Sequence, residues 1–335
     1  MDNKMINAMS TANKIIKELL AVKPEEEVLI CIDSESDMRM ANAFAAATTE
    51  VGAEYTIAMM PTRTKDKSTT VSKTLQKAME GCDVFIPMTR SSGAPAYHPK
   101  MKQLLLDKKI RECCMVLRDI DNYIKGGALA NYEEVYADGK ELCEIWRNKK
   151  KFTMTTPAGT NLTAEMISAE PIIECGVARN PGESMAFSDG EVSVGPVDFT
   201  MNGTLVLDGP MCYFGSPIEP VRMTIKDGKV ASIDGGDRRV VGEFKKLFAT
   251  IENSDNIAEI GIGLNPASLQ NGDFEEEKKA RGTVHIAFGD GTYYGQTDPS
   301  SRSQVHIDAV LYAPTVTFDG DLIVEEGKVV VLGDE

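Results

Sequence analysis

The chain has 335 residues, of which 42% are hydrophobic and 26% are charged, a composition too apolar for a disordered protein and too mixed for a coiled coil. The formal net charge is −15, and all of it lies after residue 150: residues 1–150 hold 22 basic and 22 acidic side chains, the remainder 14 and 29. Such an acidic part repels nucleic acid, so we expect no DNA or RNA partner. It is either a solvated acidic surface, which the charge alone favours, or a surface that attracts a metal cation or a substrate ammonium group.

The first segment, Met1–Leu20, carries charged side chains throughout and predicts an amphipathic helix rather than a signal peptide. No apolar run reaches the ~18 residues that cross a bilayer, so we expect a cytoplasmic protein with no membrane partner. The seven cysteines are irregularly spaced and form no CxxC pair. They predict reduced thiols rather than disulfides or a thiolate zinc site.

Up to residue 150, short apolar runs alternate with segments of helical periodicity. The predicted strands are Glu27–Ile32, Ala53–Met60, Asp83–Met88 and Glu112–Leu117. The predicted helices are Asp37–Val51, Ser68–Met79, Lys100–Lys109 and Tyr132–Lys149. Repeated β–α–β units predict a parallel sheet covered by helices.

After residue 150, short alternating strands are separated by turns that contain glycine. The predicted strands are Lys151–Thr156, Gly203–Leu207, Val221–Ile225, Lys229–Ile233, Gly282–Phe288, Gln304–Val310, Thr315–Phe318 and Lys328–Leu332, with one helix at Arg238–Ala249. Asp227-Gly228 and Asp319-Gly320 are hairpin signals. We therefore expect an α/β (Rossmann-like) domain with a parallel sheet over residues 1–150, followed by an α+β domain dominated by antiparallel sheet over residues 151–335.

His306 and Asp308 lie two residues apart in the predicted strand QVHIDAV, so their side chains would project from the same face. An imidazole beside a carboxylate on a strand suits a divalent metal, or a general base with its orienting acid. A hydrogen-bonded polar pair at a sheet edge is the alternative.

The other two histidines differ in setting. His285 interrupts the apolar strand TVHIAF, where burial without a partner would be costly; a metal, a carboxylate or a backbone carbonyl would remove that cost. His98 precedes a predicted helix in a loop, and a structural role is favoured there.

Two glutamates share the character of His285. Glu259 stands in the apolar and glycine-rich stretch IAEIGIGL, and Glu191 begins a strand after Asp189-Gly190. An acid flanked by apolar residues favours burial with a partner, although an exposed glutamate is common. Together with the histidines and Asp308, these oxygen and nitrogen ligands suit zinc, cobalt, manganese or iron(II), and five of them are enough for two ions.

Several blocks of the sequence resemble the thermophilic metallopeptidase family, of the aminopeptidase T and S type. They are Asn180-Pro181-Gly182, Gly190-Glu191-Val192, Asn202–Gly209, Ala258–Gly261, His285–Gly289 and His306–Asp308, in the family's order. The resemblance covers roughly residues 150–320 and implies release of N-terminal residues from peptides. It also implies two divalent ions (zinc, cobalt or manganese) held by Glu191, Glu259, His285, His306 and Asp308, and a homodimer.

In that family a tyrosine follows the first histidine, and here Tyr293 and Tyr294 compete for its place. The resemblance implies that one of them hydrogen-bonds the developing oxyanion, while Glu191 or Glu259 bridges the ions or acts as general base.

A relative of the same fold, the 2,5-dihydroxypyridine dioxygenase, is a mononuclear iron(II) ring-cleaving enzyme that shares the HxD pair. It has histidine where this chain has Glu259, and no equivalent of His285. We therefore expect a metallo-aminopeptidase acting on a peptide or small molecule. An iron(II) dioxygenase and a non-catalytic binding protein are the alternatives.

Overall fold

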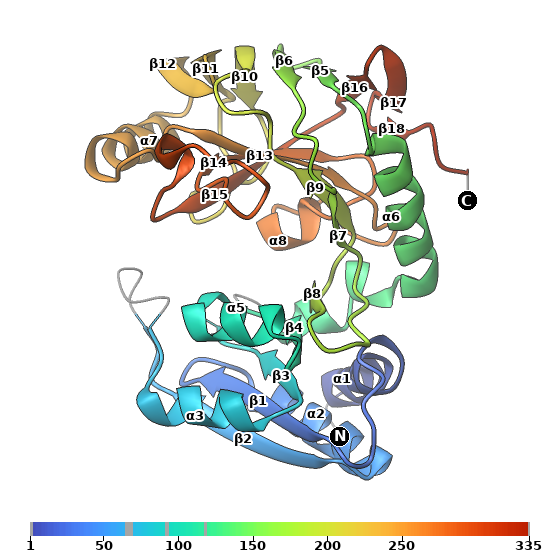
Figure 1. Cartoon of the computed structure of the whole chain (residues 1–335). Coiled ribbons are helices and arrows are strands. Elements are labelled where there is room, and N and C mark those ends of the chain that lie inside the picture. The colour runs from blue at the N-terminus through green and yellow to red at the C-terminus, as the bar shows by residue number, and fades with distance from the viewer. Residues whose placement is uncertain (1–2, 64–69, 91–93, 117–118, 334–335) are drawn as a thin grey trace. The chain divides into compact units, whose positions relative to one another are not determined.

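The computed structural model describes residues 3–63, 70–90, 94–116 and 119–333 (Figure 1). The chain folds into two compact units, residues 1–133 with 174–189, and residues 134–173 with 190–335. Composition alone predicts one boundary, after residue 150. The chain instead re-enters the first unit at residues 174–189, where the short strand β8 (Ser184–Ala186) pairs with β4 (Arg111–Cys114).

The first unit is built on a five-stranded sheet in the order β2-β1-β3-β4-β8, with every pair parallel. Its other strands are β1 (Glu27–Asp33), β2 (Glu54–Met60) and β3 (Val84–Pro87). β1 and β3 are almost wholly buried, as expected for strands covered on both faces. The predicted α/β class of this part is confirmed.

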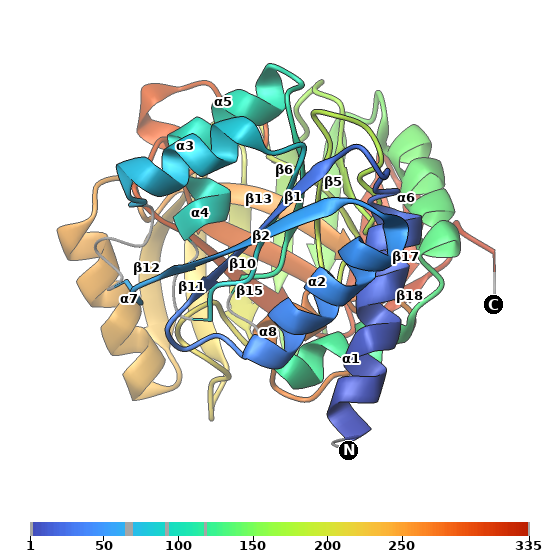
Figure 2. The same ribbon diagram turned by 90° about the horizontal axis from the view of Figure 1, so that it is seen from below.

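Helices cover both faces of this sheet: α1 and α2 lie on one side, α3 and α5 on the other (Figure 2). Their bounds are α1 (Asn3–Lys14), continued by a π-helix at Ile15–Leu19, α2 (Met38–Val51), α3 (Lys73–Gly81), α4 (Ala94–Tyr97) and α5 (Pro99–Leu106). Side chains cap three of them. Asp37 and Ser72 accept backbone N–H groups of α2 and α3, and His98 Nδ1 accepts the N–H of Lys100. Residues 68–69 and 117, at the ends of a predicted helix and a predicted strand, lie outside the described residues.

The second unit holds two sheets. The larger runs in the order β12-β11-β10-β6-β5-β16-β17-β18, and its pairs are antiparallel. Its strands are β5 (Lys151–Thr155), β6 (Asn161–Glu165), β10 (Asn202–Leu207), β11 (Val221–Lys226), β12 (Lys229–Gly235), β16 (Thr315–Phe318), β17 (Asp321–Glu325) and β18 (Lys328–Val329). The two-residue turns Asp227-Gly228 and Asp319-Gly320 close hairpins with positive φ at both residues, as the sequence predicts.

The smaller sheet runs in the order β15-β14-β13-β9-β7. Its strands are β7 (Ile172–Glu174), β9 (Glu191–Val194), β13 (Ile257–Gly263), β14 (Val284–Gly289) and β15 (His306–Leu311). The helices of this part are α6 (Tyr132–Trp146), α7 (Arg238–Thr250) and α8 (Phe274–Glu277). The predicted α+β class with mainly antiparallel sheet is confirmed.

Among the described residues, no helix has both the length and the apolar character that crossing a bilayer requires. The seven cysteines are all free thiols, five of them buried.

Candidate metal centre

One face of the smaller sheet carries all five side chains that the sequence suggests as ligands. They come from four neighbouring strands: Glu191 from β9, Glu259 from β13, His285 from β14, and His306 with Asp308 from β15. The register sets Glu259 opposite Ala287, and Ala287 opposite Asp308, so one cross-strand row joins the two carboxylates. Cross-strand partners project from the same face, which brings the two acids together.

Small residues on the same face leave room for these side chains. Gly261 pairs with His285, Gly263 with Glu191 and Gly289 with His306. At Gly261 the room is filled by the imidazole of His285, because a Cβ there would lie 2.1 Å from its Cε1. The opposite face of β13 and β14 carries Ile, Val and Phe, and all of their residues are buried.

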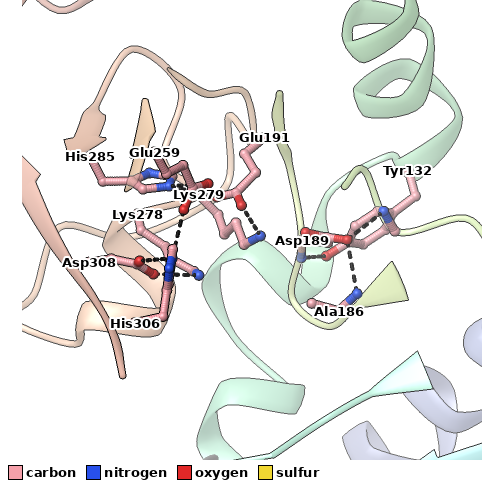
Figure 3. A network of polar contacts seen from close by, with 11 residues as sticks. Tyr132, Ala186, Asp189, Glu191, Glu259, Lys278, Lys279, His285, His306 and Asp308 are labelled. Atoms are coloured by element: carbon pink, nitrogen blue, oxygen red, sulfur yellow. Dashed lines mark hydrogen bonds and ion pairs between the residues drawn. The ribbon is translucent and has the colours of Figure 1, made fainter. Parts of the chain in front are cut away.

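The polar atoms form two overlapping groups, Glu191–Glu259–His285 and Glu259–His306–Asp308 (Figure 3). Within each group, one ligand atom from every residue lies within 4.8 Å of the others. Glu259 belongs to both: its Oε1 is 3.2 Å from His285 Nε2 and its Oε2 is 2.9 Å from His306 Nε2.

The remaining distances complete the cluster. His306 Nε2 is 2.8 Å from Asp308 Oδ1, as the two-residue spacing predicts, and His285 Nε2 is 3.7 Å from Glu191 Oε2. The Glu191, Glu259 and His285 side chains are at most 1% exposed, whereas that of His306 is 27% exposed. Within the cluster, His306 is therefore the residue that solvent reaches most readily.

Two lysines, which the sequence analysis does not single out, add positive charges beside the carboxylates of the cluster. Lys279 Nζ lies 3.0 Å from Glu191 Oε1, and Lys278 Nζ lies 3.1 Å from Asp308 Oδ2. The Lys279 side chain is fully buried, and that of Lys278 is 15% exposed. Both follow directly after α8, inside the run Glu275–Lys279, whose charges would ordinarily predict a solvated surface.

Strong mutual interactions shift the ionisation of the buried groups. Burial raises the pKa of the Glu259 carboxyl, but the imidazoles of His285 and His306 outweigh it and bring the pKa to about 2. Burial also raises the pKa of Asp308, yet Lys278 and His306 hold it well below its usual range.

The imidazoles shift in the opposite direction. Burial lowers the pKa of His306, but Asp308 and Glu259 raise it well above its usual value. The carboxylates of Glu191 and Glu259 likewise raise the pKa of His285 against its burial. The cluster thus holds ionised carboxylates that attract a positive charge, whether a proton or a metal ion.

The donor set fits a divalent metal. Three carboxylates and two imidazoles supply oxygen and nitrogen ligands, with no thiolate. In addition, His306 Nδ1 lies 2.9 Å from the backbone carbonyl oxygen of Asp290 and donates to it. Such a hydrogen bond orients a ligating imidazole and fixes its tautomer.

Of the two tyrosines, Tyr294 lies against the cluster. Its ring stacks on the imidazole of His306, with 5.0 Å between centroids and 20° between planes. Tyr293 packs edge-on against Tyr294 and is 52% exposed. His98 is a helix cap in the first unit, as the structural interpretation of that residue predicts.

The family model NicX, 2,5-dihydroxypyridine 5,6-dioxygenase, matches residues 9–331. No curated protein sequence matches the chain.

Solved structures share the fold. The structure of 2,5-dihydroxypyridine dioxygenase from Pseudomonas putida KT2440 is similar with a TM-score of 0.81 and 19% identity, covering 98% of each chain. Wild-type AmpT from Thermus thermophilus is similar with a TM-score of 0.67 and 14% identity, covering 97% of this chain and 99% of the other. Both relatives that the sequence resembles therefore have this fold.

Proposed function

Because this chain belongs to the 2,5-dihydroxypyridine 5,6-dioxygenase family, we propose that it is an enzyme, and that it depends on a divalent metal held by the cluster around Glu259. The observation that carries the proposal is the position of Glu259, whose two oxygens each face a different histidine. Burial of the Glu259 carboxylate without a cation beside it would be costly.

For the reaction we propose hydrolysis, in which the chain releases N-terminal residues from peptides. A metal ion bound there would lower the pKa of a water molecule and polarise a carbonyl group. The Glu259–His306–Asp308 group has two carboxylates and one imidazole, whereas iron(II) oxygenases of the facial-triad type use two imidazoles and one carboxylate. This difference in ligands favours hydrolysis.

The chain's own residues would divide the work. Glu259 is shared between both groups, so we assign it to metal binding and Glu191 to accepting a proton from the attacking water. We assign Tyr294, whose ring stacks on His306, to donating a hydrogen bond to the developing oxyanion. The acidic side chains of this part of the sequence would attract the substrate's ammonium group.

A second candidate is a ring-cleaving dioxygenase for a dihydroxypyridine-like substrate, with iron(II) as the metal. The family match over residues 9–331 favours it, and weighs more for this reaction than the likeness to AmpT weighs for peptide hydrolysis. The ligand group that includes Glu259, with two carboxylates and one imidazole, favours hydrolysis instead.

One pair of assays separates the two reactions. Protein purified without chelators is tested for hydrolysis of aminoacyl-p-nitroanilides with Co²⁺, Zn²⁺ or Mn²⁺, and for oxygen uptake with 2,5-dihydroxypyridine and Fe²⁺. We expect hydrolysis that is absent from His306→Ala and present in His98→Ala. Oxygen uptake without hydrolysis would replace the first candidate with the second.

A further inference from the structure

The two histidines of the cluster differ in what holds their outer nitrogen. His306 Nδ1 donates to the Asp290 carbonyl oxygen, which can only accept, so this nitrogen carries a hydrogen. His285 Nδ1 is buried and has no hydrogen-bond partner among the described residues. The tautomer is therefore fixed at His306, and no such hydrogen bond fixes it at His285.

This difference determines whether each Nε2 atom accepts or donates a hydrogen bond when the imidazole is neutral. In neutral His306, the Nε2 lone pair faces two carboxylate oxygens, Glu259 Oε2 at 2.9 Å and Asp308 Oδ1 at 2.8 Å. Three acceptors that face one another need a cation among them. Neutral His285 can instead carry its hydrogen on Nε2 and donate it to Glu259 Oε1 at 3.2 Å, which needs no metal.

Glu191 already has a cation beside it. The Lys279 ammonium group lies 3.0 Å from Glu191 Oε1, and both side chains are buried. The backbone on both sides of this lysine is tied down, because Asn265 N–H donates to the Lys279 carbonyl and Lys279 N–H to that of Glu276. Moving the ammonium group out to water would leave Glu191 buried without that charge.

Lys278 differs from Lys279 in its exposure and in the carboxylate with which it pairs. Its side chain is partly exposed, and its ammonium group pairs with Asp308 Oδ2, leaving Oδ1 directed at His306. Lys278 therefore holds one oxygen of Asp308 and leaves the other, Oδ1, facing His306.

The charges of the cluster also favour one divalent ion over two. With both imidazoles neutral, as metal ligation requires, three carboxylates against two ammonium groups leave the cluster with a single negative charge. One divalent ion reverses this to a single positive charge, which a bound hydroxide would neutralise. A second ion would raise the buried charge to plus three, at a high cost in a medium of low dielectric constant.

We propose that Lys279 is a built-in cation that takes the place of a second metal ion, so that the cluster binds one divalent ion, at Glu259, His306 and Asp308. The inference rests on the proposed metal dependence and changes its expected stoichiometry from two ions to one. Glu191 then interacts with Lys279 rather than with a metal, which leaves its carboxylate for proton transfer.

The test is metal stoichiometry, measured by calorimetric titration of the chelator-treated full chain with Mn²⁺ and by elemental analysis after dialysis. The variants are wild type, Lys279→Met, which keeps the length of the side chain and removes its charge, and Lys245→Met, a control on the exposed side of α7. We expect one equivalent in wild type and in the control, and two in Lys279→Met. The electron paramagnetic resonance spectrum should change from an isolated to a spin-coupled Mn²⁺ signal in that variant alone.

The possible outcomes separate the two proposals. No bound ion in wild type would overturn the metal dependence itself. Two equivalents in wild type, or a single equivalent in folded Lys279→Met, would overturn the role of Lys279 and leave the metal dependence standing. If Lys279→Met does not fold, Lys279→Gln takes its place, because it removes the positive charge and keeps a hydrogen-bond donor for Glu191. Two equivalents in this variant would support the proposal, and one equivalent would overturn it.

Discussion

The imidazole of His285 fills the space above Gly261 on the neighbouring strand, where a Cβ would come within 2.1 Å of Cε1 and 2.3 Å of Nε2. The two residues are direct cross-strand partners in β13 and β14. Glycine at this position is therefore what lets the imidazole lie on the sheet and reach Glu259.

We expect Gly261→Ala to displace His285 and to lower stability by about 1–3 kcal/mol, the usual cost of overpacking a buried site. Urea denaturation monitored by circular dichroism measures the loss. Gly242→Ala is the matched control, because Gly242 is exposed in α7 with no atom within 4 Å of an added Cβ. That change should raise stability by roughly 0.5–1 kcal/mol. Equal effects of the two substitutions would contradict the packing argument.

His306→Ala should weaken metal binding by at least about tenfold, because it removes the nitrogen that faces both Glu259 and Asp308. Calorimetric titration with Mn²⁺ measures the change. His98→Ala, which removes a helix cap in the first unit, should leave metal affinity as in the parent protein. Unchanged affinity in His306→Ala would place the ion elsewhere.

Tyr294→Phe keeps the ring that stacks on His306 and removes only its hydroxyl group. If this hydroxyl stabilises an oxyanion, kcat for an aminoacyl-p-nitroanilide should fall about 10²-fold with little change in KM. Tyr293→Phe, at the more exposed neighbour, should retain the parent kcat. A larger loss in the Tyr293 variant would reverse the assignment.

Glu112 predicts a pH dependence of stability that does not involve the metal centre. Burial raises the pKa of its carboxyl group to about 8, against a hydrogen bond from Ser184 that lowers it. Between its ordinary value of 4.5 and about 8, the unfolded chain releases a proton that the folded chain keeps. The free energy of unfolding therefore falls as pH rises through this range, by up to about 1.4 kcal/mol per pH unit, and levels off above it.

Glu112→Gln removes this ionisation, so we expect it to be more stable than the parent at pH 8 and about equal to it at pH 4. Chemical denaturation at a series of pH values measures the difference. Glu243→Gln, on the exposed side of α7, should follow the parent curve. A parent and a Glu112 variant with parallel curves would show that this carboxyl group ionises alike in both states.

Much of the fold could be predicted because its strands are short apolar runs and its turns carry glycine. β16 has the predicted bounds, and β1 and α2 differ from them by one residue. The strands β6, β13 and β17 were not predicted. Neither were the three-residue strands β7 and β8, because so few residues show no periodicity. Their absence from the prediction also hid the return of the chain to the first unit.

The candidate site shows the same limit. The contact between His306 and Asp308 follows from strand periodicity, since both residues belong to one strand. The approach of Glu191 depends on β9 pairing with β13, which no local pattern encodes. The lysines were missed for a different reason: the run Glu275–Lys279 has the charge of a solvated segment, yet Glu276, Glu277 and Lys279 are buried.

The order of strands in the smaller sheet ties the centre to completion of the fold. β13, β14 and β15 follow one another along the chain, but β9 lies more than sixty residues earlier and must dock beside β13. An unfolded or half-folded chain would present these ligands separately and hold an ion only weakly. An ion that binds only the completed sheet would therefore raise the free energy of unfolding, and its removal by a chelator would lower it.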